Sequence, residues 1–138
     1  MSATIEQLNL KRELHHADCF LCGKDGLGLN FSVNKDGGVI AEVNSLHRLQ
    51  GYDDVLHGGI VTSLLDAAMV NCLFAHGIVA FTAEIKVRFS FPVAVDCPVT
   101  VKAEISGRSR SIYKMEAVLL QDKVIMAKAE AKFLEKCK

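Results

Sequence analysis

The chain has 138 residues, of which 50% are hydrophobic and 23% are charged, so it is long enough for one domain that buries roughly two-thirds of its unfolded surface. Sixteen basic side chains balance sixteen acidic ones, which argues against the strong net charge of proteins that bind nucleic acids or anionic membranes. We therefore expect a single domain with no nucleic-acid partner and no membrane partner.

The cysteines and the N-terminal residues both indicate a reducing compartment. The number of cysteines is odd, and their wide spread along the chain is not the pattern of a disulfide framework. The first residues lack the charged segment and apolar core of a secretory signal. We expect reduced thiols and a cytoplasmic location.

The N-terminal third of the chain predicts one hairpin. Residues 1–18 are polar and mixed, and we expect an N-terminal arm or helix there, before a single domain over residues 19–138. Apolar residues alternate with others over 27–33 and again over 39–43, on either side of the turn-forming residues 34–38. This pattern predicts two strands joined by a turn.

A loop over about residues 45–56 leads to an apolar helix that should end near Gly77. Polar residues interrupt this helix, so the sequence predicts a buried core helix instead of a membrane span. After it the hydrophobic period changes to two, which predicts four half-buried strands. These strands cover about residues 83–91, 99–105, 113–120 and 124–133.

The predicted element order is ββαββββ. One long buried helix with strands on both sides in the sequence is best accommodated by an α+β fold, in which a curved antiparallel β-sheet wraps around the central helix. Such a sheet covers one side of its helix and leaves open edges. Dimerisation through strand pairing is therefore a physical expectation.

The central helix carries one carboxylate, Asp66, within an otherwise largely apolar sequence. Removing an ionised carboxylate from water costs several kcal/mol unless it is paired or hydrogen-bonded, so Asp66 is the first candidate for chemistry. Gly58 and Gly59 lie upstream at the predicted helix start, where unpaired N–H groups and the helix dipole bind negative charge. Acyl transfer needs both a carboxylate and a site that binds the oxyanion. The competing interpretation is a structural carboxylate held by backbone or hydroxyl groups.

Several groups of residues between about positions 19 and 133 follow the pattern of one known family. They are Cys19-Phe20-Leu21-Cys22-Gly23, Gly26-Leu27-Gly28-Leu29, Gln50-Gly51-Tyr52, Val55-Leu56-His57-Gly58-Gly59, Leu64-Leu65-Asp66-Ala67-Ala68-Met69, Ala83-Glu84-Ile85-Lys86-Val87-Arg88-Phe89, Pro92-Val93 and Gly107-Arg108. His-Gly-Gly followed by the Asp within a ββαββββ order is the specific part of this pattern. In these residues the chain resembles the hotdog-fold acyl-CoA thioesterases, in particular the phenylacetate-pathway-like branch of the 4-hydroxybenzoyl-CoA thioesterase superfamily.

The resemblance implies roles for particular residues. The N–H of Gly58 or Gly59 would polarise the thioester carbonyl, and Asp66 of the partner subunit would be the nucleophile or the general base. Gln50 and Ser90 would position water, at spacings that differ from those of the family. His57 has two interpretations, a hydrogen-bond donor to the thioester region or a cap that orders the helix start.

Candidate substrate-binding residues come from three places in the sequence. Helical spacing places Thr62 and Ser63 on a narrow polar stripe with Asp66, which would face the substrate channel. Guanidinium groups suit phosphate oxygens, so the segment Arg108-Ser109-Arg110 is a candidate for the coenzyme A phosphates, with a solvated turn as the alternative. Arg88 of the matched segment is assigned to substrate binding with them.

Cys19 and Cys22, preceded by His15 and His16, are metal-ligand types at close spacing. No second cysteine pair accompanies them in the sequence, so two partly buried thiols that order the entry to the first strand are the favoured interpretation. We therefore expect no metal among the site residues.

Taken with the resemblance, these residues predict hydrolysis of an acyl-CoA to a free acid and coenzyme A. The expected assembly is a homodimer or a dimer of dimers (a homotetramer), with no cofactor beyond the coenzyme A of the substrate. One alternative is a hotdog-fold hydratase or dehydratase, for which His76 at the helix end is the available histidine. A second is a non-catalytic acyl-CoA-binding or sensor module, since fold does not dictate function.

Overall fold

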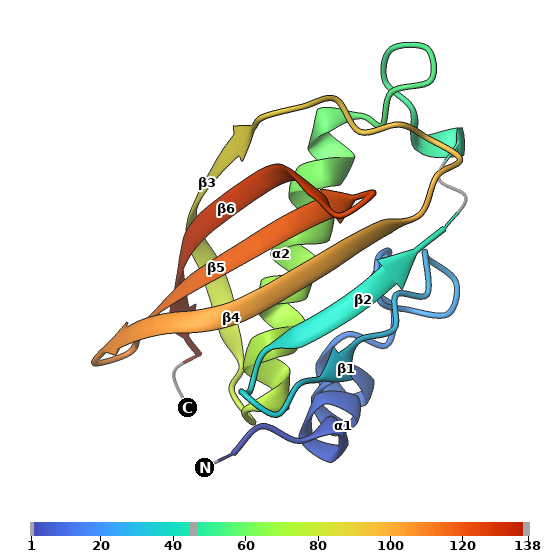
Figure 1. Cartoon of the computed structure of the whole chain (residues 1–138). Coiled ribbons are helices and arrows are strands. Elements are labelled where there is room, and N and C mark those ends of the chain that lie inside the picture. The colour runs from blue at the N-terminus through green and yellow to red at the C-terminus, as the bar shows by residue number, and fades with distance from the viewer. Residues whose placement is uncertain (1, 45–46, 137–138) are drawn as a thin grey trace.

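The computed structural model describes residues 2–44 and 47–136, and within them a six-stranded antiparallel sheet curves around one long helix (Figure 1). The strands lie in the order β1-β2-β4-β5-β6-β3. The elements are α1 (Ile5–His15), β1 (Ser32–Val33), β2 (Val39–Val43), the 3₁₀ helix η1 (His47–Leu49), α2 (Gly58–Ala75), β3 (Ala80–Phe89), β4 (Val99–Ser109), β5 (Ile112–Gln121) and β6 (Val124–Glu135). The predicted α+β hotdog architecture and its order ββαββββ are confirmed, with α1 preceding them.

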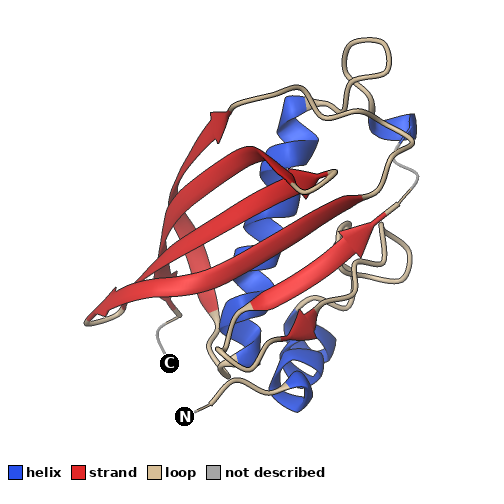
Figure 2. Cartoon of the chain, in the orientation of Figure 1, coloured by secondary structure: helices blue, strands red, loops and turns tan. Residues whose placement is uncertain are grey.

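The first residues of the chain form a capped helix. Thr4 is extended, and its Oγ1 accepts a 3.1 Å hydrogen bond from the backbone N–H of Gln7 at the start of α1. The backbone N–H of Thr4 also donates to the carbonyl of Ala75, the last residue of α2. Leu8 is fully buried, and α1 lies beside the C-terminal end of α2 (Figure 2). Of the two alternatives for this segment, the helix is the one present.

The first strand is shorter than the alternation over residues 27–33 predicts, because only Ser32 and Val33 pair with β2. Gly28 has φ +62°, in the left-handed region that ends an extended conformation. Leu29 and Phe31 are nevertheless buried, so the alternation correctly predicted which side chains face the core.

Helix α2 packs against α1, β4 and β5 and ends as the sequence predicts. Gly77, at φ +75°, donates its N–H to the carbonyl of Phe74, and Ile78 donates to the carbonyl of Leu73. These two bonds form a Schellman motif, in which a left-handed residue satisfies the last carbonyls of a helix.

Strand β3 is one edge of the sheet and contains a register shift against β6 between Thr82 and Glu84. Alternation predicts that Ala83 faces the helix, but the bulge leaves Ala83 exposed and turns Thr82 toward α2 instead. Phe89, at 54% exposure, and Phe91 are also more exposed than the predicted half-buried strand requires.

By length and composition α2 is apolar enough to cross a membrane, with a mean hydropathy of 1.5. Most of the helix is buried against the rest of the chain, however, as expected of a core helix. Figure 1 shows the sheet wrapped around it, in agreement with the sequence-based interpretation.

Candidate active site

The N-terminus of α2 presents one free backbone donor. His57 is the N-cap residue, and its Nδ1 accepts a 2.9 Å hydrogen bond from the N–H of Gly59. Ile60 and Val61 donate their N–H groups to the carbonyl of His57. The N–H of Gly58 has no hydrogen-bond partner among the described residues. Of the two predicted oxyanion donors, Gly58 is therefore the available one.

His57 takes the capping role that the sequence left open. Because Nδ1 accepts a backbone N–H, the neutral ring carries its proton on Nε2. Gly51 lies against this residue, since a Cβ at Gly51 would stand 3.2 Å from the Cα of His57. The loop before α2 and the cap are thus packed as one unit.

A cleft of about 800 Å³ opens beside this helix start. It is lined by Gln50, Gly51, Tyr52, Val55, Leu56, His57, Gly58, Val61, Phe89, Ser90, Phe91, Pro92 and Val93. Most of these side chains are apolar, and the lining also includes the polar side chains of Gln50, His57 and Ser90 and the backbone of Gly58. The cleft therefore suits a largely apolar ligand that carries a carbonyl oxygen.

Two residues predicted to position water, Gln50 and Ser90, do line this cleft. Gln50 Oε1 accepts a 3.1 Å hydrogen bond from the N–H of Asp54, so Gln50 also holds the loop. The backbone N–H of Ser90 donates to the carbonyl of Met126, which fixes this residue at the end of β3.

Asp66 lies further along α2 and is half-buried. Its Oδ1 accepts a 2.7 Å hydrogen bond from Thr82 Oγ1 on β3, and its Oδ2 has no hydrogen-bond partner within the described residues. Burial raises the pKa of the Asp66 carboxyl, while the Thr82 hydrogen bond and the nearby His16 act in the opposite direction. A partly desolvated carboxylate with one open oxygen can act as a base or as a nucleophile.

The polar stripe predicted on α2 is present and reaches solvent. Thr62 Oγ1 donates to the carbonyl of Gly58 at 3.0 Å, and Ser63 Oγ donates to the carbonyl of Gly59 at 2.8 Å. Both hydroxyl groups donate their hydrogen to a helix carbonyl, so toward a ligand each oxygen can act only as a hydrogen-bond acceptor.

The predicted arginine sites are not at the cleft of the same chain. Arg108, Ser109 and Arg110 lie at the β4–β5 turn, at the opposite end of the molecule from the start of α2 (Figure 1). Arg108 donates its Nε–H to the carbonyl of Arg110, lies 3.7 Å from Glu135 and stacks over the Tyr113 ring. A single chain cannot bring this turn to the cleft.

Arg88 is exposed on β3, where it borders a surface hollow with Lys86, Lys128 and Glu130. It does not line the cleft at Gly58. Within one chain, the structure thus brings together His57, Gly58, Gln50 and Ser90. Arg88 and the β4–β5 turn lie elsewhere, and Asp66 and its polar stripe lie further along α2.

Sequence reasoning missed Thr82, which is the direct partner of Asp66. A strict alternation in β3 turns Thr82 outward, and only the bulge after it reverses that orientation. A threonine beside an exposed small residue at the start of an edge strand is at most a weak signal for such a bulge.

Comparison with known proteins identifies the family of the chain. Residues 53–126, just over half of the chain, match the Thioesterase superfamily. The chain belongs to this superfamily. The match includes the helix start, Asp66, Thr82 and Ser90, whereas Gln50 lies just before it. No curated protein matches the chain.

Solved structures show the same fold at low sequence identity. The PaaI protein of the phenylacetic acid degradation operon of E. coli is 14% identical, with a TM-score of 0.82 over 96% of this chain and 95% of that one. A hypothetical thioesterase protein of Streptococcus pneumoniae TIGR4, solved with coenzyme A, is 19% identical, with a TM-score of 0.72 over 79% and 90% of the two chains.

A third structure, from Streptococcus mutans UA159 bound to acetyl CoA, is 16% identical, with a TM-score of 0.73 over 80% of this chain and 90% of that one. Another thioesterase superfamily protein is matched over only 53% of its own length, so this chain spans about half of that protein. These likenesses confirm the predicted fold and its resemblance to PaaI-like thioesterase superfamily proteins.

Proposed function

We propose that this chain hydrolyses an acyl-CoA thioester to a free acid and coenzyme A. The observation that carries the proposal is that one helix carries both a free N–H at Gly58 and a half-buried carboxylate at Asp66. Membership of the Thioesterase superfamily supports the reaction class. Two similar folds were solved with coenzyme A or acetyl CoA, which supports the class of substrate.

The reaction uses each group in a defined way. With Asp66 as base, the carboxylate takes a proton from water, and the hydroxide adds to the thioester carbon while the carbonyl π electrons move to oxygen. The Gly58 N–H donates to the developing oxyanion, an interaction worth roughly 3–4 kcal/mol in a dry site. The carbonyl re-forms, the carbon–sulfur bond breaks, and the proton held by Asp66 passes to the leaving thiolate.

Asp66 as nucleophile gives the same products by two steps. Its carboxylate would attack the thioester carbon and expel the coenzyme A thiolate, and water would then cleave the resulting anhydride. A single turnover in ¹⁸O-labelled water provides a test for the anhydride. General-base catalysis places the label in the acid product, whereas an unlabelled first acid, with the label in the Asp66 carboxyl, would identify an anhydride that water cleaves at the Asp66 carbonyl.

The site requires two copies of the chain. Asp66 follows Gly58 by eight residues in the same helix, about 12 Å along the axis, and Asp66 does not line the cleft at Gly58. A two-fold pairing of antiparallel α2 helices would place Asp66 of the partner subunit beside Gly58 and create two equivalent sites.

The surface needed for such pairing is exposed in the described part of the chain. Gly58 and Gly59 are exposed on α2, and the neighbouring edge strand β3 leaves Phe81 62% exposed. An uncovered edge strand and an uncovered helix stripe would both be buried by a second copy. We extend the proposal to a homodimer or a dimer of dimers, located in the cytoplasm.

The proposed function can be tested with a panel of short, medium, long and aromatic acyl-CoA esters. Hydrolysis is measured as the release of free thiol. We expect turnover of at least one ester by the pure protein and its loss in Asp66→Asn. Binding of acyl-CoA without thiol release would identify a binding or sensor module instead.

A hydratase or dehydratase is disfavoured by one contact. His76, the histidine that this alternative relied on, has its Nε2 within 2.9 Å of the Gly37 carbonyl at the far end of α2 from the cleft. The rate of water addition to an enoyl-CoA can be measured directly from the loss of absorbance of the conjugated thioester. Faster hydration than hydrolysis would overturn the proposed reaction.

A further inference from the structure

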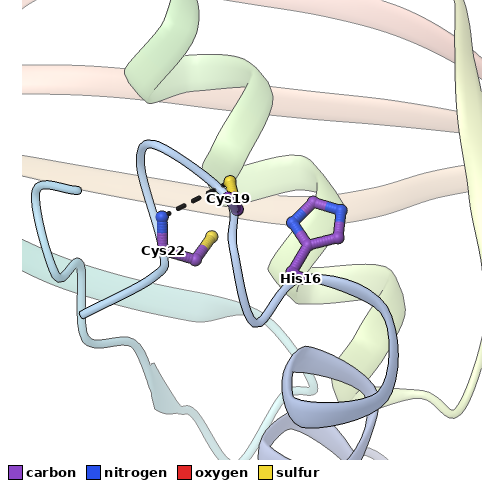
Figure 3. A group of neighbouring side chains, drawn as sticks. All are labelled: His16, Cys19 and Cys22. Atoms are coloured by element: carbon purple, nitrogen blue, oxygen red, sulfur yellow. Dashed lines mark hydrogen bonds between the residues drawn. The ribbon is translucent and has the colours of Figure 1, made fainter. Parts of the chain in front are cut away.

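Three side chains with metal-binding atoms converge just after α1. Figure 3 shows His16, Cys19 and Cys22 around one small space, with a ring nitrogen of His16 on the side that faces the cysteines. One ligand atom from each residue lies within 4.8 Å of the other two. Tetrahedral zinc with bonds of about 2.3 Å to sulfur would need sulfur atoms about 3.8 Å apart, so the two sulfurs would have to approach by no more than about 1 Å.

The backbone builds this convergence through a tight turn. The N–H of Cys19 donates to the carbonyl of His16, and the N–H of Gly23 donates to the carbonyl of Cys19 at 2.7 Å. A Cβ at Gly23 would lie 2.6 Å from the Cys19 oxygen and 2.7 Å from the Ala17 oxygen, so the turn requires glycine. The Cys-x-x-Cys-Gly sequence is therefore shaped by its own backbone to present two sulfurs together.

Both sulfur atoms accept hydrogen bonds from nitrogen. The backbone N–H of Cys22 points to Cys19 Sγ at 3.4 Å, and Nδ2 of Asn71 on α2 points to Cys22 Sγ at 3.3 Å. Donors directed at sulfur are the outer-shell contacts that orient and stabilise metal-bound thiolates. Asn71 is fully buried, so this contact lies in the core of the fold.

The histidine contains an unsatisfied atom. Nδ1 of His16 is buried and has no hydrogen-bond partner among the described residues. An unpaired buried polar atom costs free energy, and native structures usually provide it with a partner. The edge-on contact with Phe74, at 4.9 Å between ring centroids, holds the imidazole in place without satisfying this nitrogen.

We propose that His16, Cys19 and Cys22 bind one divalent zinc-class metal ion, with solvent as the fourth ligand. Two thiolates and one imidazole are a ligand set typical of zinc. A surface hollow lined by His15, Asp18 and Phe20 borders His16 and Cys19, which gives solvent a route to the fourth position. The metal would link the turn after α1 to α2, because Asn71 donates to the Cys22 ligand and Phe74 contacts the His16 ring.

This assignment replaces the sequence-based preference for two packed thiols. Packing accounts for the burial of Cys22 but not for the convergence of His16 on the same space. A Cys19–Cys22 disulfide would likewise leave His16 Nδ1 without a partner. Only a metal uses all three groups at once.

The first test uses the whole chain without substitution. Metal-free protein is prepared under reducing conditions with a chelator and titrated with Co²⁺ as a spectroscopic substitute for zinc. We expect a thiolate-to-cobalt charge-transfer band and the visible d–d bands of a tetrahedral ion, saturating at about one ion per chain. Zn²⁺ should then displace the cobalt and raise the Tm of the metal-free protein.

Matched substitutions locate the ion. Cys19→Ser, Cys22→Ser and His16→Gln should each weaken metal binding at least tenfold, whereas Cys97→Ser and His47→Gln, at exposed positions outside this hollow, should leave it unchanged. Protection of Cys19 from alkylation by added zinc, with Cys97 as the internal control, gives the same answer in the unsubstituted chain. A cobalt spectrum without a charge-transfer band, or metal binding that survives these substitutions, would overturn the site. So would a Cys19–Cys22 disulfide in a protein that, once reduced, still binds no metal.

Discussion

Thr82 Oγ1 donates a 2.7 Å hydrogen bond to Asp66 Oδ1, which joins the edge strand β3 to the middle of α2. This bond orients the carboxylate and leaves its other oxygen without a hydrogen-bond partner among the described residues. It also favours the ionised form of Asp66, against the burial that raises the pKa of that carboxyl. The pair is therefore the point at which protonation and position of the candidate base are both set.

Replacing Asp66 with asparagine should separate catalysis from folding. The amide introduced by Asp66→Asn can still accept the Thr82 hydrogen bond but cannot take a proton from water, so turnover should fall roughly a hundredfold or more. Steady-state hydrolysis of the best acyl-CoA measures this loss. Near-normal turnover in a folded Asp66→Asn protein would remove Asp66 from the mechanism.

The same variant should be the more stable protein at neutral pH. Burial raises the folded-state pKa of Asp66, so the ionised carboxylate destabilises the fold at pH values above that pKa. The penalty disappears as the pH falls below the pKa of the unfolded chain. Thermal unfolding over a pH series should show a higher Tm for Asp66→Asn at neutral pH and a smaller difference in acid; the reverse trend would contradict the sign of the shift.

Gly58→Pro should remove the oxyanion donor and little else. Proline is tolerated at the first position of a helix, where it eliminates only an N–H that the helix does not use. The preceding residue, His57, already has φ −57° and ψ 132°, which suits a residue before proline. We expect a kcat reduced roughly 100- to 1000-fold.

Gly58→Ala is the matched control for this substitution. It keeps the N–H, and its Cβ would meet the Phe89 ring at an ordinary 3.7 Å. The alanine variant should retain most of the activity. Equal losses in the two variants would mean that the side chain, and not the N–H, causes the effect.

Thr82→Val should shift the acid limb of the pH–rate profile to higher pH. Losing the hydroxyl removes a hydrogen bond that lowers the pKa of Asp66, so the base becomes protonated at a higher pH. Turnover well above this limb should change much less. Thr82→Ser, which keeps the donor, should restore the original profile, and an unchanged profile in Thr82→Val would show that the carboxyl of Asp66 does not control the limb.

Mixed dimers should reveal whether the site is shared between subunits. Light scattering is expected to show at least a dimer at micromolar concentration. If Asp66→Asn and Gly58→Pro chains are unfolded and refolded together, random pairing should restore about a quarter of the unsubstituted activity, because half of the dimers contain one intact site. An active monomer, or a mixture as inactive as its parents, would contradict the two-chain site.

Arg108 and Arg110 test whether a second copy brings the β4–β5 turn to the substrate. Replacing both with alanine should raise the Michaelis constant for acyl-CoA roughly tenfold, and much less for a truncated thioester without the nucleotide, because only the former carries the phosphates. The same increase for both substrates would reduce Arg108 to its local contacts with Glu135 and Tyr113.

The sequence predicted those parts of the fold that depend on local chemistry. The end of α2 follows from Gly77, whose left-handed conformation closes the helix. The β5–β6 turn follows from its short polar connection, although Asp122 and Lys123, both with positive φ, are not the glycine or asparagine that such turns favour. The candidate site at Gly58 and Asp66 was predicted because a carboxylate and two glycines stand out in an apolar helix.

Thr82 depends on a distant contact that no local pattern contains, because it reaches Asp66 only where β3 bulges. The other two features are local but conformational. Gly59 is withdrawn as a donor because the ring of the neighbouring His57 folds back onto its N–H, and His16 meets the two cysteines because of the tight turn after α1. Residue types and their spacing do not specify these conformations.

The capped helix α1 packs against the domain that is predicted to begin at residue 19. Leu8 is fully buried, a contribution of roughly 1.5–3 kcal/mol, and the Thr4 N–H satisfies the last carbonyl of α2. Trimming the chain to begin at residue 19 would uncover the side of the central helix that the sheet does not reach. We therefore expect α1 to unfold together with the helix that carries Asp66, and fusion partners or tags should be placed upstream of Thr4 without replacing it.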